Sequence, residues 1–129
     1  VPYLDGGLSD SIPIRRALKS GCRRAVVILT RNPGYRKKRA LKATEQLYKR
    51  AYKKYPNLVR AIMTRNAVYN RQMKLIEKLE EEGKIFVIRP LIPTVSRMEK
   101  DYDKLQHFYM HGNRLMKKEY QGLLEYLNE

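Results

Sequence analysis

An aspartate followed by two glycines, Asp5-Gly6-Gly7, is the part of the sequence best suited to chemistry. It follows a short apolar segment, Val1–Leu4, that is expected to be the end of a strand. In open α/β sheets the ligands bind at the carboxyl ends of strands, so an acid there can point its carboxylate into a cleft. The glycines allow a tight turn with positive φ and let other backbone come close. The alternative is a purely structural turn, in which the carboxylate accepts hydrogen bonds from its local backbone.

The residues after this turn predict a helix and then a buried strand. The helix is expected over Ile12–Ser20, with Ser11 as its N-cap and Gly21 as its C-terminal stop. The run Ala25–Thr30 has no polar alternation and is rich in β-branched residues, which is typical of a buried parallel strand. The segment Val1–Thr30 is therefore predicted to form a βαβ unit with a right-handed crossover.

Long helices are expected to dominate the rest of the chain. Apolar residues at helical spacing predict helices over Arg36–Tyr55, Asn57–Glu82 and Asp101–Leu127, and Gly112 and Asn113 leave either one helix or two in the last range. A further strand is predicted at Ile85–Ile88. The fold class is therefore α/β, with two to three short parallel strands and long helices. So few strands make a poor parallel sheet, and we expect the rest of the sheet to lie upstream of Val1.

Positive charge is concentrated in the middle of the chain. The sequence has 28 Lys and Arg against 13 Asp and Glu, for a net charge of +15. Between Arg31 and Arg65 there are twelve basic residues and one acid, Glu45. Such a field attracts nucleic acid, anionic lipid or an acidic partner. A solvated helix face has the same composition, so the charge alone does not select a partner.

Tyrosines are interleaved with these basic residues, at Tyr48, Tyr52, Tyr55 and Tyr69. Aromatic rings beside cations can stack on the bases of single-stranded nucleic acid. The same residues suit a membrane interface, where tyrosine lies at headgroup depth and Lys or Arg meets anionic lipid. Ordinary helix packing, with the hydroxyls at the rim, is the third explanation.

Other residues that could do chemistry are few. His107 and His111 are spaced to share one helix face, but they lack the Glu of an H-E-x-x-H motif and an obvious third ligand, so no metal site is expected. The single cysteine, Cys22, cannot form an internal disulfide, which fits a reducing compartment. No apolar run approaches the roughly 20 residues that span a bilayer. We therefore expect a cytoplasmic protein, able to lie at a membrane surface, with no cofactor.

The segment around Asp5 resembles the aspartate block of the patatin-like phospholipases. That block has Asp-Gly-Gly or Asp-Gly-Ala, a short turn, a proline that opens a helix, and a further strand. The matching residues here are Asp5, Gly6, Gly7, Ile12, Pro13 and Gly21. Downstream segments resemble a bacterial branch of the same family: Leu29–Lys37, Ile88–Pro90, Lys104, Leu105, Tyr109 and Gly112. The resemblance thus covers most of the chain.

The resemblance implies a Ser–Asp dyad that cleaves lipid esters without a catalytic histidine. In the family, a serine on a Gly-x-Ser-x-Gly elbow attacks the ester carbonyl, and a Gly-rich turn donates backbone N–H groups to the oxyanion. By motif position the dyad acid is Asp5, and Gly6 and Gly7 shape its turn. None of the four serines here, at 9, 11, 20 and 96, lies in Gly-x-Ser-x-Gly. Because the serine and the oxyanion turn precede the aspartate block in the family, we expect the isolated chain to be inactive.

The resemblance also suggests a division of the chain and a set of partners. Residues 1–97 would be the C-terminal part of the hydrolase domain, and residues 98–129 a helical extension. The expected partners are a lipid or other ester substrate, the missing N-terminal part of the same polypeptide and an anionic membrane, with Arg31 and Arg36 meeting phosphate headgroups. The alternative is a non-enzymatic module, in which the basic helices of Arg36–Arg65 bind nucleic acid or another polyanion and Asp5-Gly6-Gly7 is only a turn.

Overall fold

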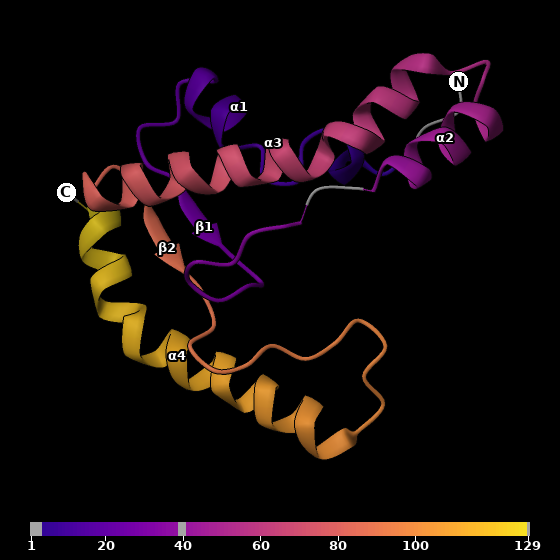
Figure 1. Ribbon diagram of the computed structural model, residues 1–129. Coiled ribbons are helices and arrows are strands. Elements are labelled where there is room, and N and C mark those ends of the chain that lie inside the picture. The colour runs from indigo at the N-terminus through magenta and orange to yellow at the C-terminus, as the bar shows by residue number, and fades with distance from the viewer. Residues whose placement is uncertain (1–3, 39–40, 129) are drawn as a thin grey trace. The chain divides into compact units, whose positions relative to one another are not determined.

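The computed structural model describes residues 4–38 and 41–128, and it is a mixed α/β structure that is mostly helical (Figure 1). Its elements in chain order are a 3₁₀ turn η1 (Gly6–Leu8), α1 (Ile14–Lys19), β1 (Val26–Ile28), α2 (Lys42–Ala51), α3 (Pro56–Glu81), β2 (Phe86–Ile88) and α4 (Tyr102–Asn128). The chain forms two compact units. The first contains η1, α1, α2 and α3 as far as Lys78, and the second contains β1, β2 and α4. These units do not follow the predicted division at residue 97, which stays a prediction about a longer protein.

The first unit is organised on α3. The buried apolar residues of α3 in this unit lie on one stripe of the helix: Val59, Tyr69, Met73 and Ile76. Ile14 of α1 is buried in the same unit. Pro56 is the first residue of α3, where its missing N–H costs nothing because that position has no intrahelical acceptor. The helix predicted over Asn57–Glu82 is therefore confirmed, with the proline as its start.

The second unit contains the sheet. β1 and β2 pair in parallel, with Val27 opposite Val87. The pairing extends beyond the strands, because the Leu29 N–H donates to the Ile88 carbonyl at 2.8 Å. The two predicted strands are thus confirmed in place and in parallel orientation, although each is only three residues long. Of the proposed third strand, Val1–Tyr3 lie outside the described residues and Leu4 is not in a strand.

The side chain of Tyr126 joins the C-terminal part of α4 to the segments that enter both strands. Its hydroxyl accepts a hydrogen bond from the Ala25 N–H at 3.1 Å and donates to the Lys84 carbonyl at 3.0 Å. Its ring lies 5.8 Å from the ring of Phe86, centroid to centroid, and the Arg24 guanidinium lies 5.2 Å from its centroid. One side chain therefore joins the helix to the segments that enter β1 and β2.

The end of α3 explains how its last turn tolerates a run of acids. Gly83 has φ +66°, the left-handed conformation that commonly ends helices. Glu80 pairs with Arg89, and Glu82 pairs with Lys84 at 2.7 Å. These cations offset the unfavourable placement of negative charge at a helix C-terminus.

The predicted start of the second helix is wrong for a reason of hydrogen bonding. The second helix begins at Lys42 instead of Arg36, because the backbone before it is held by side chains of α3. The Lys37 N–H donates to Asn70 Oδ1 at 2.9 Å, and Asn66 Nδ2 donates to the Lys38 carbonyl at 2.6 Å. Of the two possibilities for the last helix, the structure has one helix, since α4 runs unbroken through Gly112.

The N-cap predicted for the first helix is wrong as well. α1 begins at Ile14, and no side chain caps its N-terminus. The Ser11 hydroxyl instead donates to the Gly7 carbonyl at 3.0 Å, within the turn that carries Asp5. The predicted stop at Gly21 is confirmed, because Gly21 has φ +86° and follows Ser20, the C-cap of the helix.

Candidate functional site

Asp5 is exposed and caps the 3₁₀ turn that follows it. Its Oδ1 accepts a hydrogen bond from the Gly7 N–H at 2.7 Å, and its carbonyl accepts one from the Leu8 N–H at 3.0 Å. None of the described residues donates a hydrogen bond to Oδ2. The bond to Oδ1 is the local hydrogen bond that a purely structural turn predicts, and the second oxygen stays available.

The two glycines of the turn have different roles. Neither has a positive φ, so the expectation of a left-handed turn is wrong: a 3₁₀ turn uses right-handed conformations. A Cβ added at Gly7 would lie only 3.0 Å from Asp5 Oδ1, whereas a Cβ at Gly6 would meet nothing within 4 Å. A Cβ at position 7 would therefore crowd the carboxylate of Asp5, which would have to move away.

Two polar residues of α3 lie against this segment and were not found from the sequence. Gln72 is 5% exposed, and its Nε2 donates to Asp10 Oδ1. Arg65 comes close to the turn, since its Nη2 would lie 3.9 Å from a Cβ added at Gly7. Gln72 directly precedes Met73, which belongs to the apolar stripe of the helix. A polar residue so close to that stripe is the sequence signal that could have marked Gln72 as buried and hydrogen-bonded. Together these side chains add hydrogen bonding and positive charge beside the Asp5 turn.

The two arginines predicted to bind headgroups already have partners within the chain. Arg31 Nη1 donates to Thr94 Oγ1 at 3.1 Å, and the guanidinium lies 5.1 Å from the centroid of the Tyr35 ring. Arg36 pairs with Glu77 at 2.5 Å. Arg31 and Arg36 belong to different compact units. Their role as phosphate ligands stays a prediction.

The two histidines of α4 have different surroundings. His111 Nε2 accepts a hydrogen bond from the Leu91 N–H at 3.2 Å, and His107 is exposed. Across residues 4–38 and 41–128, no three His, Cys, Asp or Glu side chains come together as a metal site would require. Cys22 is an exposed free thiol. No helix in the described part of the chain has the length and apolar character needed to cross a membrane.

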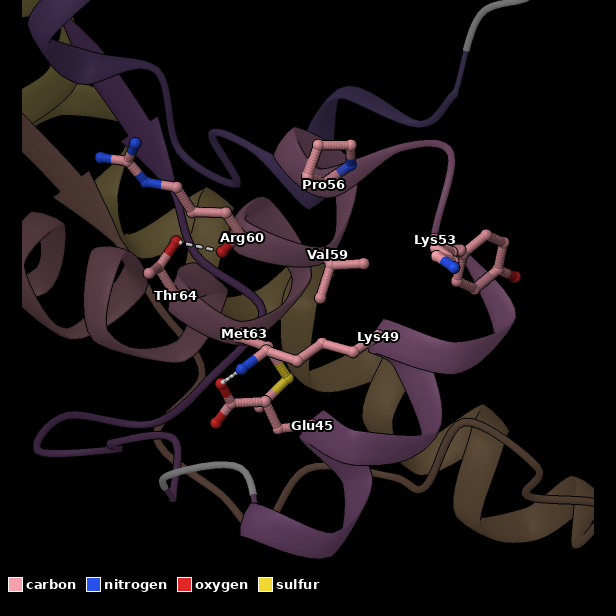
Figure 2. Close-up of a pocket in the computed structure, with 9 residues that line it drawn as sticks. Glu45, Lys49, Lys53, Pro56, Val59, Arg60, Met63 and Thr64 are labelled. Atoms are coloured by element: carbon pink, nitrogen blue, oxygen red, sulfur yellow. Dashed lines mark hydrogen bonds and ion pairs between the residues drawn. The ribbon is translucent and has the colours of Figure 1, made fainter.

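A cleft of about 360 Å³ opens between α2 and the beginning of α3 (Figure 2). Pro56, Val59 and Met63 give it an apolar lining, and the remaining lining residues are Glu45, Lys49, Tyr52, Lys53, Arg60 and Thr64. Lys49 pairs with Glu45 at 2.8 Å. Figure 2 shows Lys53 and the Arg60 guanidinium on opposite sides of Val59. The cleft is thus an apolar space flanked by cations.

Residues 55–128 match the family described as "Domain of unknown function (DUF6363)", which is more than half of the chain. The chain belongs to the DUF6363 family. No curated protein and no solved structure matches it. The DUF6363 region takes in α3, β2 and α4, so Gln72 and Arg65 lie inside it. The Asp5 turn and α2 precede it.

Proposed function

We propose that this chain is the C-terminal part of a patatin-like lipid acyl hydrolase, with Asp5 as the acid of a Ser–Asp dyad. The observation that favours the proposal over a purely structural turn is the second oxygen of the Asp5 carboxylate. Its Oδ1 is fixed by the Gly7 N–H at 2.7 Å, and its Oδ2 receives no hydrogen bond from the described residues. A carboxylate held by one oxygen can present the other to a hydroxyl in a set direction.

The sheet supports the proposal that more polypeptide completes the domain. Parallel sheets normally have both faces covered. On β1, however, Val26 is 39% exposed and Ile28 is 72% exposed. Two strands of three residues are also shorter than an independent sheet needs. Both observations fit the edge of a larger patatin-like sheet, whose remaining strands, nucleophile elbow and oxyanion turn would precede Val1.

In the proposed reaction Asp5 moves one proton at each step. The serine hydroxyl attacks the ester carbonyl of the lipid and its proton passes to Asp5 Oδ2. The carbonyl re-forms, the C–O bond to the alcohol breaks, and Asp5 returns the proton to the departing alkoxide. Water then attacks the acyl-serine, again giving its proton to Asp5, and the serine oxygen leaves with that proton as the fatty acid is released. The Gly7 N–H keeps the carboxylate in place throughout.

The test uses the protein extended upstream of Val1 and an ester substrate presented in micelles. We expect Asp5→Asn to lower the turnover by about a hundredfold or more, which is the usual contribution of a general base. Asp10→Asn is the matched control, because it makes the same chemical change in the same segment and its amide oxygen can still accept the bond from Gln72. Equal activity of Asp5→Asn and the parent protein would rule out the dyad.

A second measurement separates the chain from the longer protein. A fluorophosphonate probe, which reacts with activated serines, should label the extended protein and leave residues 1–129 unlabelled. Strong labelling of the 129-residue chain would mean that one of its own serines is activated, contrary to the proposal. If the extended protein neither hydrolyses esters nor reacts with the probe, the non-enzymatic alternative, a basic module that binds a polyanion, takes its place.

A further inference from the structure

We propose that the α2–α3 hairpin, residues 41–64, docks the protein on a bilayer that contains anionic phospholipid. The proposal does not depend on the Asp5 dyad. It rests on three properties of the hairpin: unbalanced positive charge, exposed apolar side chains, and the cleft between its two helices.

The charge of the hairpin has almost no internal compensation. No acid occurs between Glu45 and Glu77, and Glu45 already pairs with Lys49 at 2.8 Å. Lys53, Lys54 and Arg60 are exposed and have no ion pair with any described residue. Each such cation near an anionic membrane contributes independently to binding, so the hairpin is electrostatically complementary to a phosphate-rich surface.

Large apolar side chains are exposed among these cations. Leu41 is 74% exposed, Leu47 is 67% exposed and Tyr55 is 62% exposed. Water-exposed leucines have no function in a surface that only contacts phosphates. A helix with apolar residues and surrounding lysines is suited to lie in the headgroup region of a bilayer, with tyrosine at the same depth.

The cleft adds apolar surface between the cations. Pro56 and Met63 line it, and Lys53 and Arg60 stand on opposite sides of it (Figure 2). The cations are therefore spread over a surface and do not converge on one phosphate. Tyr48 and Tyr52 stack on each other, with centroids 6.0 Å apart, which leaves Tyr55 as the exposed ring of the hairpin that could stack on a base. The exposed Leu41 and Leu47 have no such role with nucleic acid, whereas a bilayer would cover them. The arrangement favours a bilayer over nucleic acid.

The first test is co-sedimentation of the chain with phosphatidylcholine vesicles, with and without phosphatidylglycerol, over a salt series. Binding should require phosphatidylglycerol and weaken as salt rises. Replacing both turn lysines, Lys53→Gln with Lys54→Gln, should weaken binding about thirtyfold. The matched control is Lys117→Gln with Lys118→Gln, an exposed pair on α4 that carries the same charge. The control should lose clearly less affinity.

The second test places a reporter on the apolar residues. The sequence contains no tryptophan, so Leu47→Trp introduces a single tryptophan, whose emission can be excited apart from that of the ten tyrosines. Its emission should shift to the blue on binding anionic vesicles, and brominated lipid should quench it. Tyr120→Trp on α4, where the native tyrosine is 54% exposed, is the control and should show neither effect. Circular dichroism confirms that each variant is folded.

Three results would overturn the proposal. Equal losses of vesicle affinity for the two pairs of lysine substitutions would mean that binding depends on net charge alone and is not localised to the hairpin. A Leu47→Trp emission that stays unshifted on bound vesicles would mean that the hairpin does not enter the bilayer. Binding to a single-stranded oligonucleotide, without binding to anionic vesicles at the same salt, would assign the basic surface to nucleic acid. None of these results bears on the dyad.

Discussion

The hydroxyl of Tyr126 gives the sharpest test of how the second unit is held together. Tyr126→Phe removes one oxygen and keeps the ring. The contacts of that ring with Phe86, at 5.8 Å, and with the Arg24 guanidinium, at 5.2 Å, should survive. What disappears is the acceptor for the Ala25 N–H at 3.1 Å and the donor to the Lys84 carbonyl at 3.0 Å.

The size of the effect follows from these two hydrogen bonds. A typical intramolecular hydrogen bond contributes about 0.5–1.5 kcal/mol net to stability. The bond to Lys84 is exposed, and water can replace the lost donor there. The bond from Ala25 is partly buried, so its loss is compensated less well. We therefore expect Tyr126→Phe to reduce the free energy of unfolding by about 1–2 kcal/mol.

Urea denaturation followed by circular dichroism measures this change. With a slope of about 1–3 kcal/mol per molar urea, the midpoint should fall by several tenths molar or more. Tyr120→Phe is the matched control, because it makes the same change on the same helix at a residue that is 54% exposed. It should leave the midpoint unchanged. If the two variants have the same midpoint, the hydroxyl of Tyr126 does not join α4 to the strands and the reasoning fails.

Two further predictions concern the Asp5 turn and the start of α4. In the extended protein, Gly7→Ala should lower the rate of ester hydrolysis while Gly6→Ala should not, because only a Cβ at position 7 comes within 3.0 Å of Asp5 Oδ1. Equal activity of the two variants would show that the carboxylate is not held as described. Asp101 accepts hydrogen bonds from the Asp103 and Lys104 amides, and the Lys104 amide above all lowers its pKa below the ordinary 3.8. A lowered pKa means that this cap contributes fully above the ordinary pKa and is lost as the pH falls through the folded value. An NMR titration should show the two amides shifting only at more acidic pH than an unperturbed aspartate would give, and Asp101→Asn should remove the shift.

The strongest sequence patterns located most of the elements. The apolar run at Ala25–Thr30 and the helical stripe of α3 carry their own signals, because burial selects residue types at a fixed period. The start of α2 carried no such signal. It depends on Asn66 and Asn70, which bond to the backbone of residues 37 and 38 from a different part of the chain. Contacts of that kind cannot be found from local spacing.

The same difference applies to the candidate site. The Asp-Gly-Gly motif points to Asp5, because a carboxylate followed by two glycines can be recognised from residue types alone. A positive φ was the wrong reason for glycine at position 7. The backbone conformation of the turn, and the closeness of the Asp5 carboxylate to Gly7, are properties of the three-dimensional structure. The contacts of Gln72 and Arg65 with the segment that follows Asp5 are found only in the three-dimensional structure, where α3 and this segment belong to one unit. The sequence shows that both residues are polar, but it does not show that they lie beside the Asp5 turn.

The open side of β1 has a consequence for the behaviour of the chain in solution. Among the described residues β1 pairs only with β2, so its outer edge offers unpaired backbone groups beside the exposed side chain of Ile28. Such an edge can recruit an identical strand from another molecule and begin aggregation. The net charge of +15 opposes this by mutual repulsion. Dilute salt should therefore keep separate copies apart, and concentrated salt should let them associate through this edge.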